Sequence, residues 1–351
     1  MPLKIGVIGT GMIGEDHIRR LTQVLSGAEI VAVSDVDARK AQAVADRIGA
    51  RRHETGEALI ADPNVEAVVI ASWGRTHAAY VLAALAAQKP VFCEKPLATS
   101  SADCRRIVEA EAALGRRLVQ VGFMRRFDPA YVAMQRLIAA GRIGTPLMFH
   151  SVHRNASVPP SYIPAMILDD TCVHDIDISR WLLADEVKAV TVKSARRNSK
   201  GRADLADPTL VLLEMAQGGL VDIEISVQIG YGYDIRGEVV GETGTVALST
   251  GSPVDLRSAG AVSGHVPEDW RERFITAYDE EFRHWLPAAA AGSATGPSCW
   301  DGYAATLATE AAARARDSGQ TQTITMIDKP ALYASPNGDQ GPERTIFAAG
   351  G

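Results

Sequence analysis

The side chains best suited to chemistry lie in two short segments of the 351-residue chain. Lys95 follows the apolar run Val91–Cys93, between a carboxylate and a proline, where a buried strand is predicted to end. Asp170 and His174 lie four residues apart, a spacing that places them on one face of a helix. A neutral histidine can accept a proton near neutral pH, and a lysine can stabilise an oxygen that becomes negative. These residue types predict a site that removes the proton of a hydroxyl group.

Each of these residues also has a simpler interpretation. A lysine at a strand end is most often a surface charge, and Asp169 and Asp170 suit a helix N-terminus because its dipole favours negative charge. That interpretation does not account for His174 and Asp177, which continue the same helix face. Asp170 can instead orient the His174 ring, as a carboxylate does in a catalytic triad. The same spacing can chelate a metal, but a lysine in the same cleft would repel the cation, and we expect no metal.

A glycine pattern near the N-terminus predicts a dinucleotide site. Residues 9–14 have the form G-x-G-x-x-G and lie between the strand-like run Leu3–Ile8 and a helical segment. Gly9 would allow the tight turn, Gly11 the close approach of a pyrophosphate, and Gly14 close packing of helix on strand. The free N–H groups at the helix N-terminus would then bind phosphate. The alternative is an incidental glycine-rich turn, which the position between strand and helix disfavours.

An acidic residue in the right place suggests which dinucleotide is bound. Asp35 ends the second predicted strand, 21 residues beyond Gly14, where a carboxylate meets the adenosine ribose. Such a carboxylate accepts from the ribose hydroxyls and repels a 2′-phosphate, which favours NAD over NADP. Asp37 fits the N-cap of the next helix, so Asp35 could also be only a neighbour of that cap.

Strand and helix signals alternate through the first third of the chain, which predicts a parallel sheet covered on both faces. Its predicted strands are Leu3–Ile8, Glu29–Ser34, Ala67–Ile70, Val91–Cys93 and Leu118–Val121. Strand signals dominate after Gly122, which predicts a mostly antiparallel sheet with helices on one face. The helices expected there are Asp128–Ala140, Asp170–Leu183, Trp270–Ala291 and Trp300–Arg316.

Composition excludes several other classes of protein. Hydrophobic residues make up 46% and charged residues 22%, which is typical of a globular chain and not of a disordered one. The net charge of −6, without a basic stripe, argues against nucleic-acid binding. No apolar run reaches the roughly 18 residues of a membrane span, and Met1–Lys4 lacks the layout of a secretory signal. Four scattered cysteines are expected to be reduced thiols of a cytoplasmic protein.

Longer runs of sequence add a family resemblance over nearly the whole chain. They are GTGMIGEDHIRRL, SWGRTH, VFCEKPLAT, LVQVGFMRRFD, HRN at 153–155, DDTCVHDID, YGYDI, GPSCWDGY and KPALY. On these runs the chain resembles the glucose–fructose oxidoreductase/inositol dehydrogenase (Gfo/Idh/MocA) family, most closely its inositol 2-dehydrogenases. The resemblance implies an α/β chain with a Rossmann domain over residues 1–123. It also implies an α+β substrate domain over 124–335 that builds a homotetramer through its open sheet. We expect residues 336–351 to form a flexible tail.

The resemblance also assigns roles to individual residues. Catalysis falls on Lys95, Asp170 and His174. Cofactor contacts fall on Gly9, Gly11, Met12, Ile13, Gly14, Asp35, Ser72, Trp73, His77 and Glu94. Substrate hydroxyls would meet Met124, Arg125, His153, Asn155, Thr171, Asp177 and Tyr233.

The implied reaction is the NAD-dependent oxidation of a cyclic polyol to a ketone, with myo-inositol converted to 2-keto-myo-inositol. Two departures from the family pattern flank the substrate cleft. Ala156 replaces an expected proline, and the segment Ser157–Leu168 diverges. Scyllo-inositol or an aldopyranose such as glucose therefore stays open as the substrate. A nucleotide-binding sensor without catalysis is the alternative of a different class, and the retention of Lys95, Asp170 and His174 argues against it.

Overall fold

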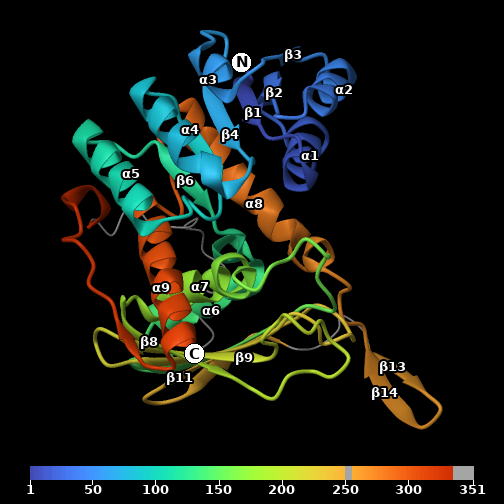
Figure 1. The fold of residues 1–351 in the computed structure, drawn as a ribbon, viewed down its shortest axis with the longest axis vertical. Coiled ribbons are helices and arrows are strands. Elements are labelled where there is room, and N and C mark those ends of the chain that lie inside the picture. Colours follow the sequence, from blue (N-terminus) through green and yellow to red (C-terminus); the bar gives the residue numbers. More distant parts are fainter. Residues whose placement is uncertain (250–254, 335–351) are drawn as a thin grey trace, which may run out of the picture.

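The computed structural model describes residues 1–249 and 255–334, and the predicted tail lies outside the described residues (Figure 1). The N-terminal part is a parallel sheet in the order β3-β2-β1-β4-β5-β6. Its strands are β1 (Leu3–Ile8), β2 (Ala28–Ser34), β3 (Arg51–Arg52), β4 (Ala67–Ile70), β5 (Val91–Glu94) and β6 (Val119–Gly122). β4 is buried along its whole length, as expected of a parallel strand covered on both faces. The sequence-based prediction of this sheet is confirmed, although the short β3 was missed.

The helices between these strands begin at recognisable caps. They are α1 (Met12–Arg19), which continues as the π-helical turn η1 (Arg20–Val24), α2 (Ala38–Ile48), α3 (Gly56–Ala61), α4 (Gly74–Ala86) and α5 (Ser101–Leu114). The Asp37 carboxylate accepts from the backbone N–H groups of Arg39 and Lys40 and so caps α2. Ser100 caps α5 by accepting from the N–H of Asp103. Asp37 is therefore the cap, which leaves Asp35 available for another role.

One helix from the C-terminal half completes the N-terminal core. α8 (Trp270–Ala290) runs beside the N-terminal sheet in Figure 1. Phe282 and Trp285 are fully buried, and the Phe282 ring lies 4.3 Å from that of Phe92 on β5, centroid to centroid. The two halves of the chain are therefore joined by a shared apolar cluster as well as by the chain itself.

The second sheet has the order β12-β11-β7-β10-β9-β8-β15. Its strands are β7 (Pro146–Arg154), β8 (Val187–Ser194), β9 (Thr209–Met215), β10 (Leu220–Ser226), β11 (Asp234–Gly241), β12 (Thr245–Ala247) and β15 (Gln322–Thr323). β7 and β10 are parallel and the other neighbouring pairs are antiparallel, so the prediction of a mostly antiparallel sheet is confirmed.

Helices α6 (Pro129–Ala139), α7 (Val173–Leu183) and α9 (Cys299–Ser318) lie on one side of this sheet (Figure 1). α7 is preceded by a π-helical turn, η3 (Ile167–Cys172), and α6 by a 3₁₀ turn, η2 (Met124–Phe127). A hairpin of β13 (Asp255–Ser258) and β14 (Ala261–Gly264) projects from the body, and the short turn η4 (Ala331–Tyr333) follows β15. Within the described ranges, no helix is both long and apolar enough to cross a membrane.

Candidate active site

A cavity of about 270 Å³ lies between the N-terminal strand ends and the second sheet. Its lining residues come from segments far apart in the sequence, and they are Met12, Ile13, Ser72, Glu94, Lys95, Met124, His153, Asn155, Asp170, Thr171, His174, Tyr233, Trp270 and Tyr278. Trp270 and Tyr278, both on α8, are the lining residues that sequence reasoning missed. No short motif marks them, because α8 reaches the cavity only through its packing on the other half of the chain.

The glycine turn at the edge of this cavity has the form expected of a phosphate cradle. Gly9 has φ +97°, and a Cβ on Gly14 would lie 2.0 Å from the carbonyl oxygen of Gly9. Both positions therefore require glycine for the fold itself. Nothing lies within 4 Å of where a Cβ of Gly11 would stand, and no side chain caps the N-terminus of α1. Open space beside free N–H groups fits the pyrophosphate of a dinucleotide.

Asp35 is tied to the same turn. Its Oδ2 accepts from the Thr10 N–H at 2.6 Å and from the Thr10 hydroxyl at 3.1 Å, while Oδ1 accepts from the N–H of Asp37 at 2.8 Å. The carboxylate thus stands at the end of β2, beside the cradle, where a ribose would lie. It also holds the glycine turn in place, a second role that the sequence did not predict.

The other cofactor-side residues differ in what they contact. Ser72 lines the cavity, whereas Trp73 precedes α4 and is exposed, with the Arg75 guanidinium over its ring. His77 is buried with its ring nitrogens 2.7 Å from the Pro96 carbonyl oxygen and 3.0 Å from that of Ser72. Both of its polar atoms thus hold the two turns that border the site, and a contact of His77 with the cofactor stays a prediction.

The Glu94 carboxylate is held by His17 and by the backbone of Lys95. Its Oε1 lies 2.7 Å from Nε2 of the buried His17, and its Oε2 accepts from the N–H of Lys95 at 3.2 Å. The far side of the His17 ring lies 3.1 Å from the Arg20 guanidinium. A carboxylate that lines the cavity is thus fixed by a helix, α1, that also carries the phosphate cradle.

Lys95 projects into the cavity and pairs with Asp170. Its ammonium donates to Asp170 Oδ1 at 2.5 Å and to the Asp170 carbonyl oxygen at 3.1 Å. The prediction that Asp170 orients His174 is wrong in this structure, because the carboxylate contacts the lysine. The physical reason is local geometry: Asp170 lies in the π-helical turn η3 and His174 in α7, so the assumed regular α-helical spacing does not hold.

His174 lines the cavity from the first turn of α7. It is buried, and its Nδ1 has no hydrogen-bond partner among the described residues. Burial lowers the pKa of His174 well below its usual value, and the positive charges of Lys95 and Arg125 add to this effect. The imidazole is therefore neutral at pH 7, which is the state that can accept a proton.

A buried network lies directly behind His153. Asp175, wholly buried on α7, accepts from Arg125 Nη1 at 2.6 Å, from the Ser151 hydroxyl at 2.8 Å, and lies 2.7 Å from His153 Nδ1. Arg125 is buried and its charge is neutralised by Asp175, so its contact with substrate stays a prediction. Asp175 was not predicted. It could have been suspected only as one more carboxylate in the DDTCVHDID run.

Asp177 is also placed behind the site. Its carboxylate accepts from Arg126 Nη2 at 2.6 Å and from Nε at 2.9 Å, and it is buried away from the cavity. Its role in binding substrate stays a prediction; in this structure its partner is Arg126, which also pairs with Asp301. Burial raises the pKa of Asp177 to about 6, although Arg126 opposes the shift.

The remaining predicted substrate residues do line the cavity. Met124 contributes an apolar wall, and Asn155 presents a side-chain oxygen that has no hydrogen-bond partner within residues 1–249 and 255–334. The Thr171 hydroxyl is 2.7 Å from the hydroxyl of Tyr162, and Tyr233 is buried with its hydroxyl 3.4 Å from His153 Nε2. Tyr162 belongs to the divergent segment, which therefore reaches the cavity through Thr171.

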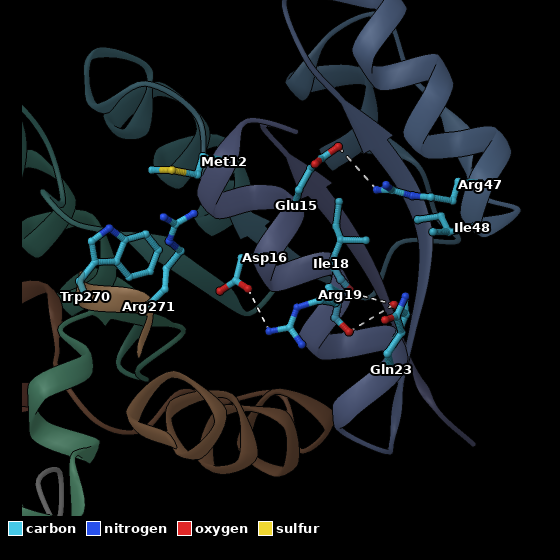
Figure 2. A pocket seen from close by; sticks show the side chains of 11 residues that line it. Met12, Glu15, Asp16, Ile18, Arg19, Gln23, Arg47, Ile48, Trp270 and Arg271 are labelled. Atoms are coloured by element: carbon cyan, nitrogen blue, oxygen red, sulfur yellow. Dashed lines mark hydrogen bonds and ion pairs between the residues drawn. The ribbon is translucent and has the colours of Figure 1, made fainter. Parts of the chain in front are cut away.

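A second, larger hollow of about 610 Å³ runs along the outer side of α1 (Figure 2). It shares Met12 and Trp270 with the cavity but contains neither the lysine nor the histidines. Four of its charged groups form two pairs, since Glu15 lies 3.6 Å from Arg47 and Asp16 lies 3.0 Å from Arg19. We therefore place the chemistry in the smaller cavity.

Comparison with known proteins agrees with this geometry. Residues 3–123 match the oxidoreductase family with the NAD-binding Rossmann fold (GFO/IDH/MocA), and residues 131–247 match the C-terminal domain of that family. The chain belongs to this family. Inositol 2-dehydrogenase 3 of Saccharopolyspora erythraea is 53% identical over 337 residues, covering 96% of this chain and 100% of the relative. An inositol 2-dehydrogenase of Acidothermus cellulolyticus is 51% identical, covering 95% and 98%.

A solved structure is similar over almost the same length. Myo-inositol dehydrogenase from Lactobacillus casei, in complex with NAD(H) and myo-inositol, superposes with a TM-score of 0.92 at 38% identity, covering 95% of this chain and 100% of that one. The chain is thus an oxidoreductase of a family that uses NAD.

Proposed function

We propose that the protein oxidises a cyclic polyol with NAD, converting myo-inositol to 2-keto-myo-inositol. The observation that carries the proposal is a cavity in which Lys95, a neutral His174 and several hydroxyl-pairing groups meet beside a dinucleotide cradle. Relatives about half identical are named inositol 2-dehydrogenases, and the Lactobacillus casei structure contains NAD(H) and myo-inositol. These findings support the polyol as the substrate class.

The cofactor would be held by the glycine turn and its surroundings. The open space at Gly11 and the N-terminus of α1 would receive the pyrophosphate, and Asp35 the adenosine ribose. Met12, Ile13 and Ser72 would border the part that enters the cavity, near Glu94. When bound, NAD supplies the acceptor for the hydride that leaves the carbinol carbon.

The chain's own residues handle the proton. The neutral imidazole of His174 accepts the hydroxyl proton, for which a lowered pKa keeps it available at pH 7. The Lys95 ammonium donates to the same oxygen and stabilises it as negative charge develops. Asp170 holds that ammonium in place through its carboxylate and its carbonyl oxygen. We propose Lys95 and His174 as catalytic residues and Asp170 as the group that positions Lys95.

The rest of the cavity suits a ring with many hydroxyls. His153, Asn155, Thr171 and Tyr233 supply donors and acceptors from three separate segments of the chain. Leaving such groups unpaired costs about 1–3 kcal/mol each, so a fully hydroxylated ring is favoured over a deoxy analogue. Because Tyr162 of the divergent segment positions Thr171, the same mechanism could serve scyllo-inositol or glucose, and we place myo-inositol first.

One assay tests this function. Purified protein and NAD would be supplied in turn with myo-inositol, scyllo-inositol, D-glucose and a monodeoxy-inositol, and kcat/KM followed by NADH formation. We expect myo-inositol to be the best substrate and the deoxy analogue to be poor. An acyclic alcohol or a carboxylic acid as the best substrate would contradict the polyol, and NAD binding without any turnover would favour a sensor.

We also propose that the protein is a homotetramer, with a second copy covering the open face of the second sheet. Leu210, Leu212 and Leu220 are exposed on β9 and β10, and Leu210 and Leu212 oppose Glu224 and Asp222 in register. Alternating leucines and carboxylates on an uncovered sheet face support burial against another subunit. Light scattering should give the mass of four chains, and Leu212→Asp should lower it. A monomeric wild type would contradict this.

We place the protein in the cytoplasm, the compartment that fits its thiols. Cys93, Cys104, Cys172 and Cys299 are buried and free of disulfides. Reduced, buried thiols are the usual form of cysteine in a reducing compartment, and this supports the assignment.

A further inference from the structure

The carboxylate of Asp175 has its two oxygens committed to different partners. Oδ1 accepts from Arg125 Nη1 at 2.6 Å and from the Ser151 hydroxyl at 2.8 Å. Oδ2 lies 2.7 Å from Nδ1 of His153. Burial raises the pKa of Asp175, but Arg125 and His153 hold it below its usual range, so the group is an ionised carboxylate that can only accept.

These contacts decide which nitrogen of His153 carries the proton. Burial lowers the pKa of His153 although Asp175 opposes the shift, so the ring is neutral and has a single N–H. Nδ1 also lies 2.9 Å from Arg125 Nη2 and could in principle accept from it. That alternative would set the Nδ1 lone pair against a carboxylate oxygen at 2.7 Å. The proton therefore lies on Nδ1, and Nε2 is left with a lone pair.

The free Nε2 faces the substrate cavity. His153 lines that cavity, and the nearest described partner of Nε2 is the Tyr233 hydroxyl at 3.4 Å, a long hydrogen bond. A polyol hydroxyl that enters the cavity can donate to this nitrogen at a shorter distance. An imidazole fixed in this way accepts a hydrogen bond but cannot donate one.

We propose that Asp175 is a positioning residue that fixes the tautomer of His153, so that the cavity requires a substrate hydroxyl that donates at one ring position. The inference rests on the proposed polyol dehydrogenase function and deepens it. It separates the two histidines of the cavity: His174 takes up the proton in the reaction, whereas His153 selects the substrate.

Asp175→Asn is the variant that tests the tautomer. Arg125 and Ser151 both donate toward the Oδ1 position, so the amide oxygen of the asparagine should occupy it. The amide nitrogen then faces His153 Nδ1 and donates to it, which moves the ring proton to Nε2. Ser151→Ala is the matched control, because it removes one donor to the same carboxylate without placing a donor against His153.

The substrate readout uses monodeoxy-monofluoro-myo-inositols, in which fluorine replaces one hydroxyl at a time and cannot donate. In the wild type we expect one ring position where this exchange lowers kcat/KM by about 10–10²-fold through loss of the donor. In Asp175→Asn the loss of kcat/KM at that position should fall to about threefold or less, and the losses at the other ring positions should be unchanged. In Ser151→Ala the loss at that position should remain as in the wild type. Unchanged ratios, or a uniform loss at every position, would overturn the proposal.

A second readout does not depend on turnover. ¹⁵N NMR of histidine-labelled wild type, with the His153 signals assigned by their absence in His153→Gln, should show the proton on Nδ1. In folded Asp175→Asn it should move to Nε2. A wild-type ring with its proton on Nε2 overturns the inference even if Asp175→Asn fails to fold. If no polyol is oxidised, the proposed function fails, while this measurement still decides the tautomer.

Discussion

The cofactor side and the substrate side of the cavity are built in different ways. The cofactor side is local: the glycine turn follows β1 directly, and Asp35, at the end of the next strand, is bonded to Thr10 of that turn. The substrate side takes Lys95 from the turn after β5, His153 from β7 and His174 from α7. Backbone sterics shape the cofactor side, whereas the substrate side depends on which side chains pair with one another after folding. Substitutions on the cofactor side should therefore act by filling space beside the backbone. Substitutions on the substrate side should act by changing charges or the position of a proton.

The largest effect is expected on the substrate side, at the base. His174→Ala should lower kcat by about 10²–10⁴-fold because the variant lacks the proposed base for the hydroxyl proton. In the wild type, protonation of His174 should abolish activity, and its lowered pKa should put the acidic limb of the kcat/KM profile below pH 6.5. That limb should vanish in the variant.

The control for the base is a histidine outside the cavity. His284 on α8 lies 2.7 Å from the Glu280 carbonyl oxygen of its own helix, and His284→Ala should keep both rate and profile. An acidic limb that persists unchanged in His174→Ala would show that another group is the base.

Lys95→Met should come next, with a loss of about 10²–10³-fold in kcat, since a preorganised charge at the reacting oxygen is removed. NAD binding, measured by titration calorimetry, should be nearly unchanged because the cradle lies on α1. A variant that retains a third of the wild-type kcat would remove Lys95 from the mechanism.

On the cofactor side, Asp35→Ser should shift the ratio of kcat/KM for NAD over NADP by about 10–10²-fold toward NADP. The cause is loss of a carboxylate that pairs with the ribose and repels a 2′-phosphate. Asp37→Ser removes a neighbouring carboxylate but keeps an N-cap side chain for α2, and it should leave the ratio unchanged. A wild type that already prefers NADP would contradict the role given to Asp35.

The smallest effect should come from a matched pair of glycines. A Cβ added at Gly11 meets only open space, so Gly11→Ala should leave the melting temperature unchanged. The same substitution should weaken NAD binding about tenfold. Gly14→Ala places a Cβ against the Gly9 carbonyl and should lower the free energy of unfolding by about 1–3 kcal/mol. If both variants lost stability equally, the distinction between Gly11 as a phosphate-binding position and Gly14 as a packing position would be wrong.

The same contrast explains what could be predicted from sequence. Strand and helix periodicity predicted both sheets, and the motifs located most of the residues that line the cavity. Partner choice could not be predicted: Asp170, Asp175 and Asp177 lie in one short run, yet they pair with Lys95, with Arg125 and His153, and with Arg126 respectively. These choices depend on the π-helical turn before α7 and on which arginines are already buried there.

The packing of α8 was also beyond sequence reasoning. Its apolar residues predict a buried helix, but nothing local indicates that Phe282 and Trp285 pack on the N-terminal sheet. Trp270 and Tyr278 consequently reach the cavity without a motif to mark them.

We propose that a proton and a hydride leave one carbinol of a cyclic polyol bound in the cavity. This proposal is tested most directly with myo-inositol deuterated at C2, the carbon with the axial hydroxyl, and NAD. Mass spectrometry should find the deuterium in the NADH, and the initial rate should not exceed that with unlabelled substrate. NADH formed without deuterium would show that another carbon is oxidised, and no NADH at all would contradict the account.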